Sequence, residues 1–97
     1  MHKILILLAA GTALLSTGAQ ADPRARFMGA NCSYCHGPEG KSHGAIPSLA
    51  GMDPGYFVQQ MKAFRDGTRK ATVMNKHANG YSDAEFEAMA KYFAAIK

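Results

Sequence analysis

Cys32-Ser33-Tyr34-Cys35-His36 is the stretch of this 97-residue chain that decides its fold. Its two thiols stand three positions apart, a spacing at which both can form thioether bonds to the vinyl groups of one haem. The histidine that follows directly can place its imidazole on the haem iron as the proximal ligand. The pattern therefore predicts that Cys32 and Cys35 attach one covalent haem c and that His36 ligates its iron.

Three other uses of a cysteine pair are alternatives to haem attachment. A thioredoxin-like redox couple expects a βαβ pattern, and the sequence contains no strand-rich run. A zinc site expects a second ligand pair, but there is no second CxxC, and His43 and His77 lack the usual zinc spacing. A disulfide would close a two-residue loop, which removes little entropy from the unfolded chain. Haem attachment is favoured over all three.

Residues 1–21 have the pattern of a secretory signal peptide. A lysine near the start precedes an apolar run from Ile4 to Leu15, and Ala19-Gln20-Ala21 forms an A-x-A cleavage site. The run is too short to span a bilayer comfortably, so we expect no stable membrane insertion, with an uncleaved anchor as the alternative. Cleavage after Ala21 would leave residues 22–97 as a single monohaem domain in the periplasm.

The size and charge of the remaining segment limit its possible functions. So short a chain has difficulty building a sufficient core, and a covalent haem would supply a large apolar body for it. Ten lysines and arginines against seven acidic residues give it a charge of about +3. Several of the basic residues fall in one stretch, namely Arg65, Arg69, Lys70 and Lys76. They form either a solvated loop or a surface that attracts an acidic partner. Nucleic-acid binding is not expected, because no reader motif is present.

Hydrophobic spacing predicts an all-α domain of about three main helices joined by loops rich in glycine and proline. The first helix is expected from Pro23 to about Cys32, with Asp22 as a possible N-cap. The segment from Gly37 to Gly51 contains six glycines and prolines and is expected to be an extended loop.

The other two helices have clearer boundaries. Asp53-Pro54 has the pattern of an N-cap followed by an N1 proline, and Gly67 is the expected stop of the second helix. Residues 68–81 are expected to form a second loop. The third helix begins with the capping box Ser82-Asp83-Ala84-Glu85 and continues with a clear apolar stripe.

A haem iron held by one histidine has a second axial position to fill. Met74 lies in the predicted loop before the last helix, from which its thioether can reach the opposite side of the ring, and we expect it to be the sixth ligand. Met52 and His77 are weaker alternatives. Met61 and Met89 lie on apolar helix faces, where core packing is expected. If Met74 does not bind, the iron is open, and a haem sensor or enzyme is possible.

Several segments together resemble a class I cytochrome c across residues 22–97. They are the helix end Gly29-Ala30-Asn31-Cys32, the CSYCH motif, the loop Pro47-x-Leu49-Ala50-Gly51, a distal methionine and a C-terminal helix. The resemblance implies a small all-α fold of about three main helices wrapped around one covalent haem. It also implies that the Pro47 carbonyl accepts the other ring N–H of the axial histidine. Gly29 would pack against Tyr92 or Phe93 of the last helix.

A further set of short segments is similar to the haem subunit of flavocytochrome c sulfide dehydrogenase. These segments are Met52-Asp53-Pro54, Ala71-Thr72-Val73-Met74 and Gly80-Tyr81-Ser82. The similarity implies an FAD-containing flavoprotein partner that oxidises sulfide, and a soluble or membrane electron acceptor. The chain itself would then be no enzyme. Some members of that family carry two haem domains, whereas this sequence has one CxxCH. It therefore remains open whether the chain is a stable subunit or a free electron carrier.

Overall fold

A computed structural model describes Gly11 and residues 22–97, so the predicted signal peptide, apart from Gly11, lies outside the described residues. Between residues 22 and 97 the chain is helical and contains no strand. In chain order the elements are α1 (Ala25–His36), the 3₁₀ turn η1 (Pro38–Gly40), α2 (Pro54–Asp66), α3 (Met74–Ala78) and α4 (Asp83–Ala94). None of the described helices is long and apolar enough to cross a lipid bilayer.

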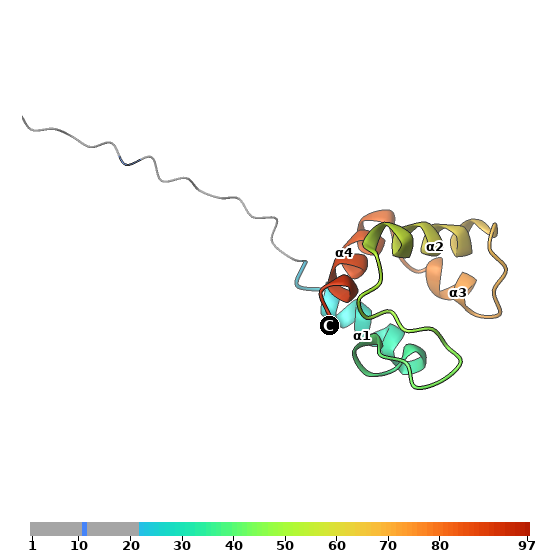
Figure 1. Cartoon of the computed structure of the whole chain (residues 1–97). Helices are drawn as coiled ribbons and strands as arrows, with labels where there is room; N and C mark the ends of the chain where they lie inside the picture. The colour runs from blue at the N-terminus through green and yellow to red at the C-terminus, as the bar shows by residue number, and fades with distance from the viewer. Residues whose placement is uncertain (1–10, 12–21) are drawn as a thin grey trace, which may run out of the picture.

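Helix α4 is the centre of the molecule. It contacts both α1 and α2, and α2 in turn contacts α3 (Figure 1). Its side chains Phe86, Met89 and Phe93 are fully buried. Together with Ala90 of α4, they pack against residues of the other α-helices and of the loop before α2, namely Met28, Leu49, Phe57, Met61 and Ala78. Met61 and Met89 thus pack in the core, as their helical spacing predicted.

Helix α1 differs at both ends from the predicted helix Pro23–Cys32. It begins two residues later, at Ala25, because Asp22 closes a turn instead of capping the helix. The Asp22 side chain accepts a hydrogen bond from the Arg24 amide (2.8 Å), and the Asp22 carbonyl accepts one from the Ala25 amide (3.0 Å). It also continues through the whole cysteine motif to His36. The motif contains no glycine or proline, and the first residue that can end the helix is Gly37, at φ 90°.

The close approach of α1 to α4 takes place at Gly29, as the resemblance implied. A Cβ atom placed on Gly29 would lie 2.7 Å from Cε1 of Tyr92 and 3.2 Å from Cζ of Phe93. The rings of Tyr92 and Phe93 meet edge to face with centroids 5.1 Å apart, so neither can turn aside freely. A residue without a side chain is therefore needed where the two helices cross.

The predicted ends of α2 and the predicted start of α4 are confirmed. The Asp53 carboxylate accepts from the Tyr56 amide at 2.9 Å, and Gly67 ends α2 in the left-handed conformation at φ 79°. Both bonds of the capping box are present in α4: the Ser82 hydroxyl accepts from the Glu85 amide, and the Glu85 carboxylate accepts from the Ser82 amide.

The segment 68–81 is not only a loop, because residues Met74–Ala78 form the short helix α3. Met74, expected in a loop, is the first residue of this helix. Five residues are too few to form a stable helix alone. Helix α3 is held by its packing on α2, where Ala78 is fully buried. The local sequence shows no such signal, and tertiary contact therefore overrides the loop prediction.

The segment from Gly37 to Gly51 is a loop interrupted by η1, and backbone hydrogen bonds attach it to the helices. The Leu49 amide donates to the Gly40 carbonyl (2.7 Å), and the Gly51 amide donates to the Phe93 carbonyl of α4 (2.8 Å). Gly40, at φ 72°, lies so close to Phe93 that a Cβ atom there would be 2.8 Å from the ring. These contacts place Pro47, which lies between Gly40 and Leu49, beside the end of α1.

Candidate functional site

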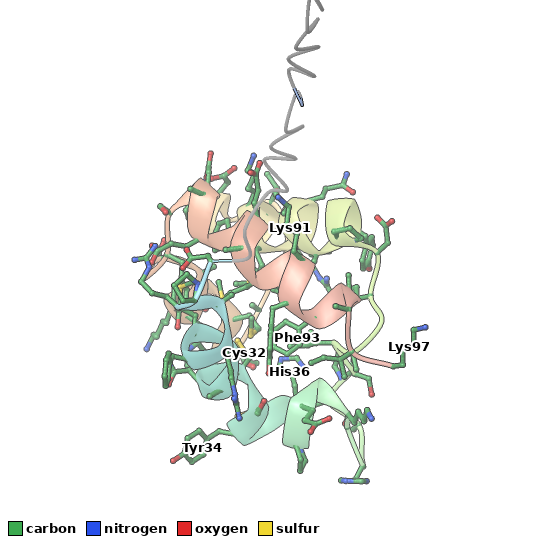
Figure 2. All side chains as sticks on the ribbon, turned by 90° about the vertical axis from the view of Figure 1, so that its left-hand side faces the viewer. Cys32, Tyr34, His36, Lys91, Phe93 and Lys97 are labelled. Atoms are coloured by element: carbon green, nitrogen blue, oxygen red, sulfur yellow. The ribbon has the colours of Figure 1, made fainter. Side chains whose placement is uncertain are left out.

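The cysteine motif forms the last turns of α1, so one helix carries all three predicted haem contacts. Cys32 is half-buried and packs against the hydrophobic core, Cys35 is exposed, and both thiols are free. His36 is only 7% exposed and is the one polar side chain among the buried residues of the described chain. Figure 2 shows Cys32 and His36 on the inner side of α1, while Tyr34 points away from the molecule.

The orientation of His36 is set by the loop that faces it. Its Nδ1 atom lies 2.6 Å from the carbonyl oxygen of Pro47. A carbonyl oxygen can only accept a hydrogen bond, so Nδ1 must carry the proton and donate. The lone pair of Nε2 is thereby left free for a metal, and the hydrogen bond makes it a better donor. The structure thus brings His36 and Pro47 together in the arrangement that the family resemblance implied.

The two methionines considered for the sixth position both lie at the edge of the core. Met74 is half-buried at the start of α3, and Met52 is half-buried in the loop before α2. Cys32, on α1, packs against the same core cluster, which is therefore bordered by sulfur atoms from three parts of the chain. The assignment of Met74 as the iron ligand stays a prediction. His77, the weaker alternative, is exposed.

Asn75 is a polar residue of this region that the sequence did not suggest. Its side-chain oxygen is buried and has no hydrogen-bond partner, which is the only such case among the described residues. A buried unpaired amide oxygen is unfavourable, because it loses its hydrogen bonds to water. Asn75 directly follows Met74, so this unpaired group lies beside the predicted ligand. No sequence pattern could have identified it, since burial of this one atom depends on how α3 packs.

These observations fit a covalently bound haem. Two free thiols lie one helical turn apart, and the imidazole beside them already has its Nδ1 committed to a carbonyl. Half-buried side chains of Cys32, Met52 and Met74 border the core. An orphaned polar atom belongs to Asn75, the residue after Met74. A thiol pair, one imidazole and one thioether form the donor set that haem c uses.

The half-buried cysteine of the motif has a shifted pKa. Burial raises the pKa of the Cys32 thiol, and a backbone hydrogen bond is the smaller, opposing effect. The thiol therefore stays protonated at neutral pH. This environment argues against the thioredoxin-like alternative, in which one cysteine has a lowered pKa.

The basic stretch that the sequence identified divides into two parts. Arg65 pairs with Asp83 and Asp66, and Arg69 donates to the Gln60 side chain and lies over the Phe64 ring. Lys70 and Lys76 are exposed and form no ion pair within residues 22–97. The two exposed lysines of this stretch therefore lie on either side of Met74 in the sequence.

Comparisons with known proteins identify relatives along the whole described domain. The family model "Cytochrome c" matches residues 21–97. The cytochrome subunit of sulfide dehydrogenase from Chlorobaculum tepidum is 36% identical, over 94% of this chain and 90% of that protein. The thiosulfate dehydrogenase electron acceptor of Stutzerimonas stutzeri is 44% identical over 67% of this chain.

A solved structure of cytochrome c4 from Acidithiobacillus ferrooxidans has the same fold. It superposes with a TM-score of 0.69 at 30% identity and covers 81% of this chain. The chain spans 53% of that structure and 32% of the Stutzerimonas protein, so both are considerably longer.

Proposed function

Because this chain belongs to the cytochrome c family of haem c electron-transfer proteins, we propose that it is the haem subunit of a flavoprotein sulfide dehydrogenase. The relative named as a sulfide dehydrogenase cytochrome subunit supports this assignment, because it matches nearly the full length of both chains. The partner would be an FAD-containing subunit that oxidises sulfide. Residues 22–97 would act as one monohaem domain in the periplasm, after removal of residues 1–21.

Each site residue has one role in the proposal. Cys32 and Cys35 would hold the haem by thioether bonds, and His36 and Met74 would ligate its iron. Pro47 keeps the His36 ring in place and Nδ1 protonated through the 2.6 Å hydrogen bond. A haem held there would supply one-electron transfer, and ligation by both His36 and Met74 would leave no position for a substrate. The chain would therefore pass electrons without chemistry of its own.

The His36–Pro47 hydrogen bond is the observation that carries the electron-transfer assignment. The bond keeps Nδ1 of this buried histidine as a hydrogen-bond donor to Pro47 and leaves the other ring nitrogen free to bind a metal. His36 also directly follows the paired thiols. The test of the partner is size-exclusion chromatography of the native protein, followed by haem absorbance and flavin fluorescence together. Haem and flavin should elute in one peak larger than a small monomer. Haem alone at monomer size would contradict the subunit assignment.

A free electron carrier is the second candidate, and the exposed Lys70 and Lys76 favour it. Unpaired cations near Met74 would attract an acidic docking site on an oxidase or reductase. Such an encounter weakens steeply as added salt screens the charges. A haem-only monomer whose reduction rate falls with ionic strength would support the carrier. A stable, salt-independent complex with a flavoprotein would support the subunit.

A further inference from the structure

The two most exposed large apolar side chains of the described protein lie on the same helix. Tyr34 is 92% exposed and Phe27 is 75% exposed, both on α1. The other exposed large hydrophobics are considerably less so, at 43–52%, and lie in other segments. Single exposed apolar residues are common, but two aromatic rings on one helix face are unusual for a surface that meets only water.

Their spacing places both rings on one side of the helix. Phe27, Asn31 and Tyr34 stand at i, i+4 and i+7, and Ala30 lies between them. All four are exposed, and they are called here the outer α1 face. Its four residues carry no charge, although the exposed Arg24 and Arg26 border it. It lies opposite the residues of α1 that are buried, namely Ala25, Met28, Gly29 and His36.

The outer α1 face is linked to a neighbouring segment and includes part of the cysteine motif. The Asn31 side chain donates to the Tyr81 hydroxyl (3.4 Å), which ties the face to the segment just before α4. Tyr34 stands between the two cysteines of the motif, and Figure 2 shows it pointing away from the molecule. A protein covering Tyr34 would therefore lie one residue from Cys35 and two residues from Cys32 along the same helix.

We propose that the outer α1 face is the docking surface for the flavoprotein subunit, an inference that rests on the proposed function. Uncharged faces with exposed aromatic anchors suit long-lived complexes, whereas unpaired cations suit brief, salt-sensitive encounters. The free lysines Lys70 and Lys76 lie in a different part of the chain, around α3. The molecule thus has one surface for a permanent electron donor and another for a transient acceptor.

The test compares tyrosine nitration in the native haem–flavin complex and in the cytochrome separated from it. Tyr34 should react readily with tetranitromethane when the cytochrome is free and at least about tenfold less in the complex, since interface aromatics are buried on binding. Tyr56 is the internal control, because it is 47% exposed on α2, away from the proposed face. Its reaction should be the same in both samples.

Two variants complete the test. Phe27→Ser lies outside the cysteine motif and should raise the Kd for the separated flavoprotein by at least about tenfold, with the haem content and visible spectrum unchanged. Tyr56→Ser, the matched control, should leave that Kd within about twofold. The Kd is measured by adding the reconstituted cytochrome to the separated flavoprotein and following flavin fluorescence.

The outcomes separate the two proposals. A haem–flavin complex in which Tyr34 is nitrated as fast as in the free cytochrome would overturn the docking face and leave the subunit assignment intact. Failure to find any haem–flavin complex would overturn both. Protection of Tyr34 in a haem-only dimer would also overturn the inference, because a second copy of this chain would then be the occupant.

Discussion

At the scale of single residues, His36 shows how the fold selects the chemistry of one side chain. Its burial removes water from the ring, and the Pro47 carbonyl holds the proton on Nδ1. An imidazole in water would interchange its two neutral forms, but this one is restricted to the form that leaves Nε2 free. Burial also raises the pKa of the neighbouring Cys32 thiol, so the helix carries a metal ligand beside a thiol that is protonated at neutral pH.

The prediction at this scale concerns the sixth ligand. Met74→Ala should leave the haem covalently attached but open one axial position, since the thioether is removed and the cysteines are untouched. The reduction potential should fall by a measurable part of the ~0.8 V range that axial ligands span. Potentiometry and carbon monoxide binding to the reduced protein measure the change.

Met52→Ala is the matched control for this prediction. Met52 is also half-buried and packed against the core, so its loss removes a similar volume near the site. The potential and the visible spectrum should stay near those of the unmodified protein. If Met52→Ala opened the iron and Met74→Ala did not, the ligand assignment would be wrong.

At the scale of elements, the crossing of α1 and α4 depends on one glycine. Gly29 lets the two helix backbones approach until Tyr92 lies directly against the α1 main chain. This contact places the cysteine motif beside the buried end of α4, where Phe93 also holds the loop through Gly40 and Gly51. A shift of α1 would therefore displace the attachment site and the His36–Pro47 pair together.

Gly29→Val should lower the free energy of unfolding of the haem-bound protein by about 1–3 kcal/mol. The new Cβ alone would lie 2.7 Å from the Tyr92 ring, which is overpacking, and valine's helix propensity offsets it by only a few tenths. Guanidinium denaturation measures the change. Gly44→Val is the control, because nothing lies within 4 Å of a Cβ there, and it should change stability by about 0.5 kcal/mol or less. Equal losses in both variants would contradict the role of the crossing.

At the scale of the whole molecule, α2 and α4 are joined by ion pairs as well as by the core. Arg65 and Lys62 of α2 both contact the Asp83 carboxylate at the start of α4. The hydrogen bond from Arg65 is the main reason that the pKa of Asp83 lies below its ordinary value of 3.8. The folded protein therefore binds this proton less readily than the unfolded chain, and acid favours unfolding.

Asp83→Asn should make the protein less sensitive to acid. The stability that Asp83 contributes is complete above its ordinary pKa of 3.8 and is lost as the pH falls through the lower pKa of the folded state. The variant should therefore melt below the unmodified protein at pH ~7, and the difference in Tm should shrink at pH ~2. The expected difference is small and should decrease with salt, because the pair is exposed.

Glu87→Gln removes an α4 carboxylate that forms no ion pair between residues 22 and 97, and serves as the control. It should leave the pH dependence of Tm unchanged. A Tm difference between Asp83→Asn and the unmodified protein that stays constant from neutral to acid pH would show that the Arg65–Asp83 pair is not responsible.

The sequence alone determined the features that depend on residues close together in the chain. Asp53 and Gly67 mark the ends of α2, and Ser82 and Glu85 mark the start of α4, because capping bonds join residues within a few positions of one another. The paired thiols and His36 likewise identify haem attachment from five consecutive residues. Their meaning does not depend on the rest of the fold.

Only the tertiary structure decided the features that depend on distant packing. Helix α3 forms where Ala78 is buried beside α2, and the Asn75 oxygen on the same helix is buried without a partner. Phe27 and Tyr34 remain exposed because none of the described elements covers that side of α1. The pairing of His36 with Pro47 was implied by resemblance and required a loop held on Gly40 and Phe93. Such contacts join residues far apart in the chain, and short-range patterns carry no information about them.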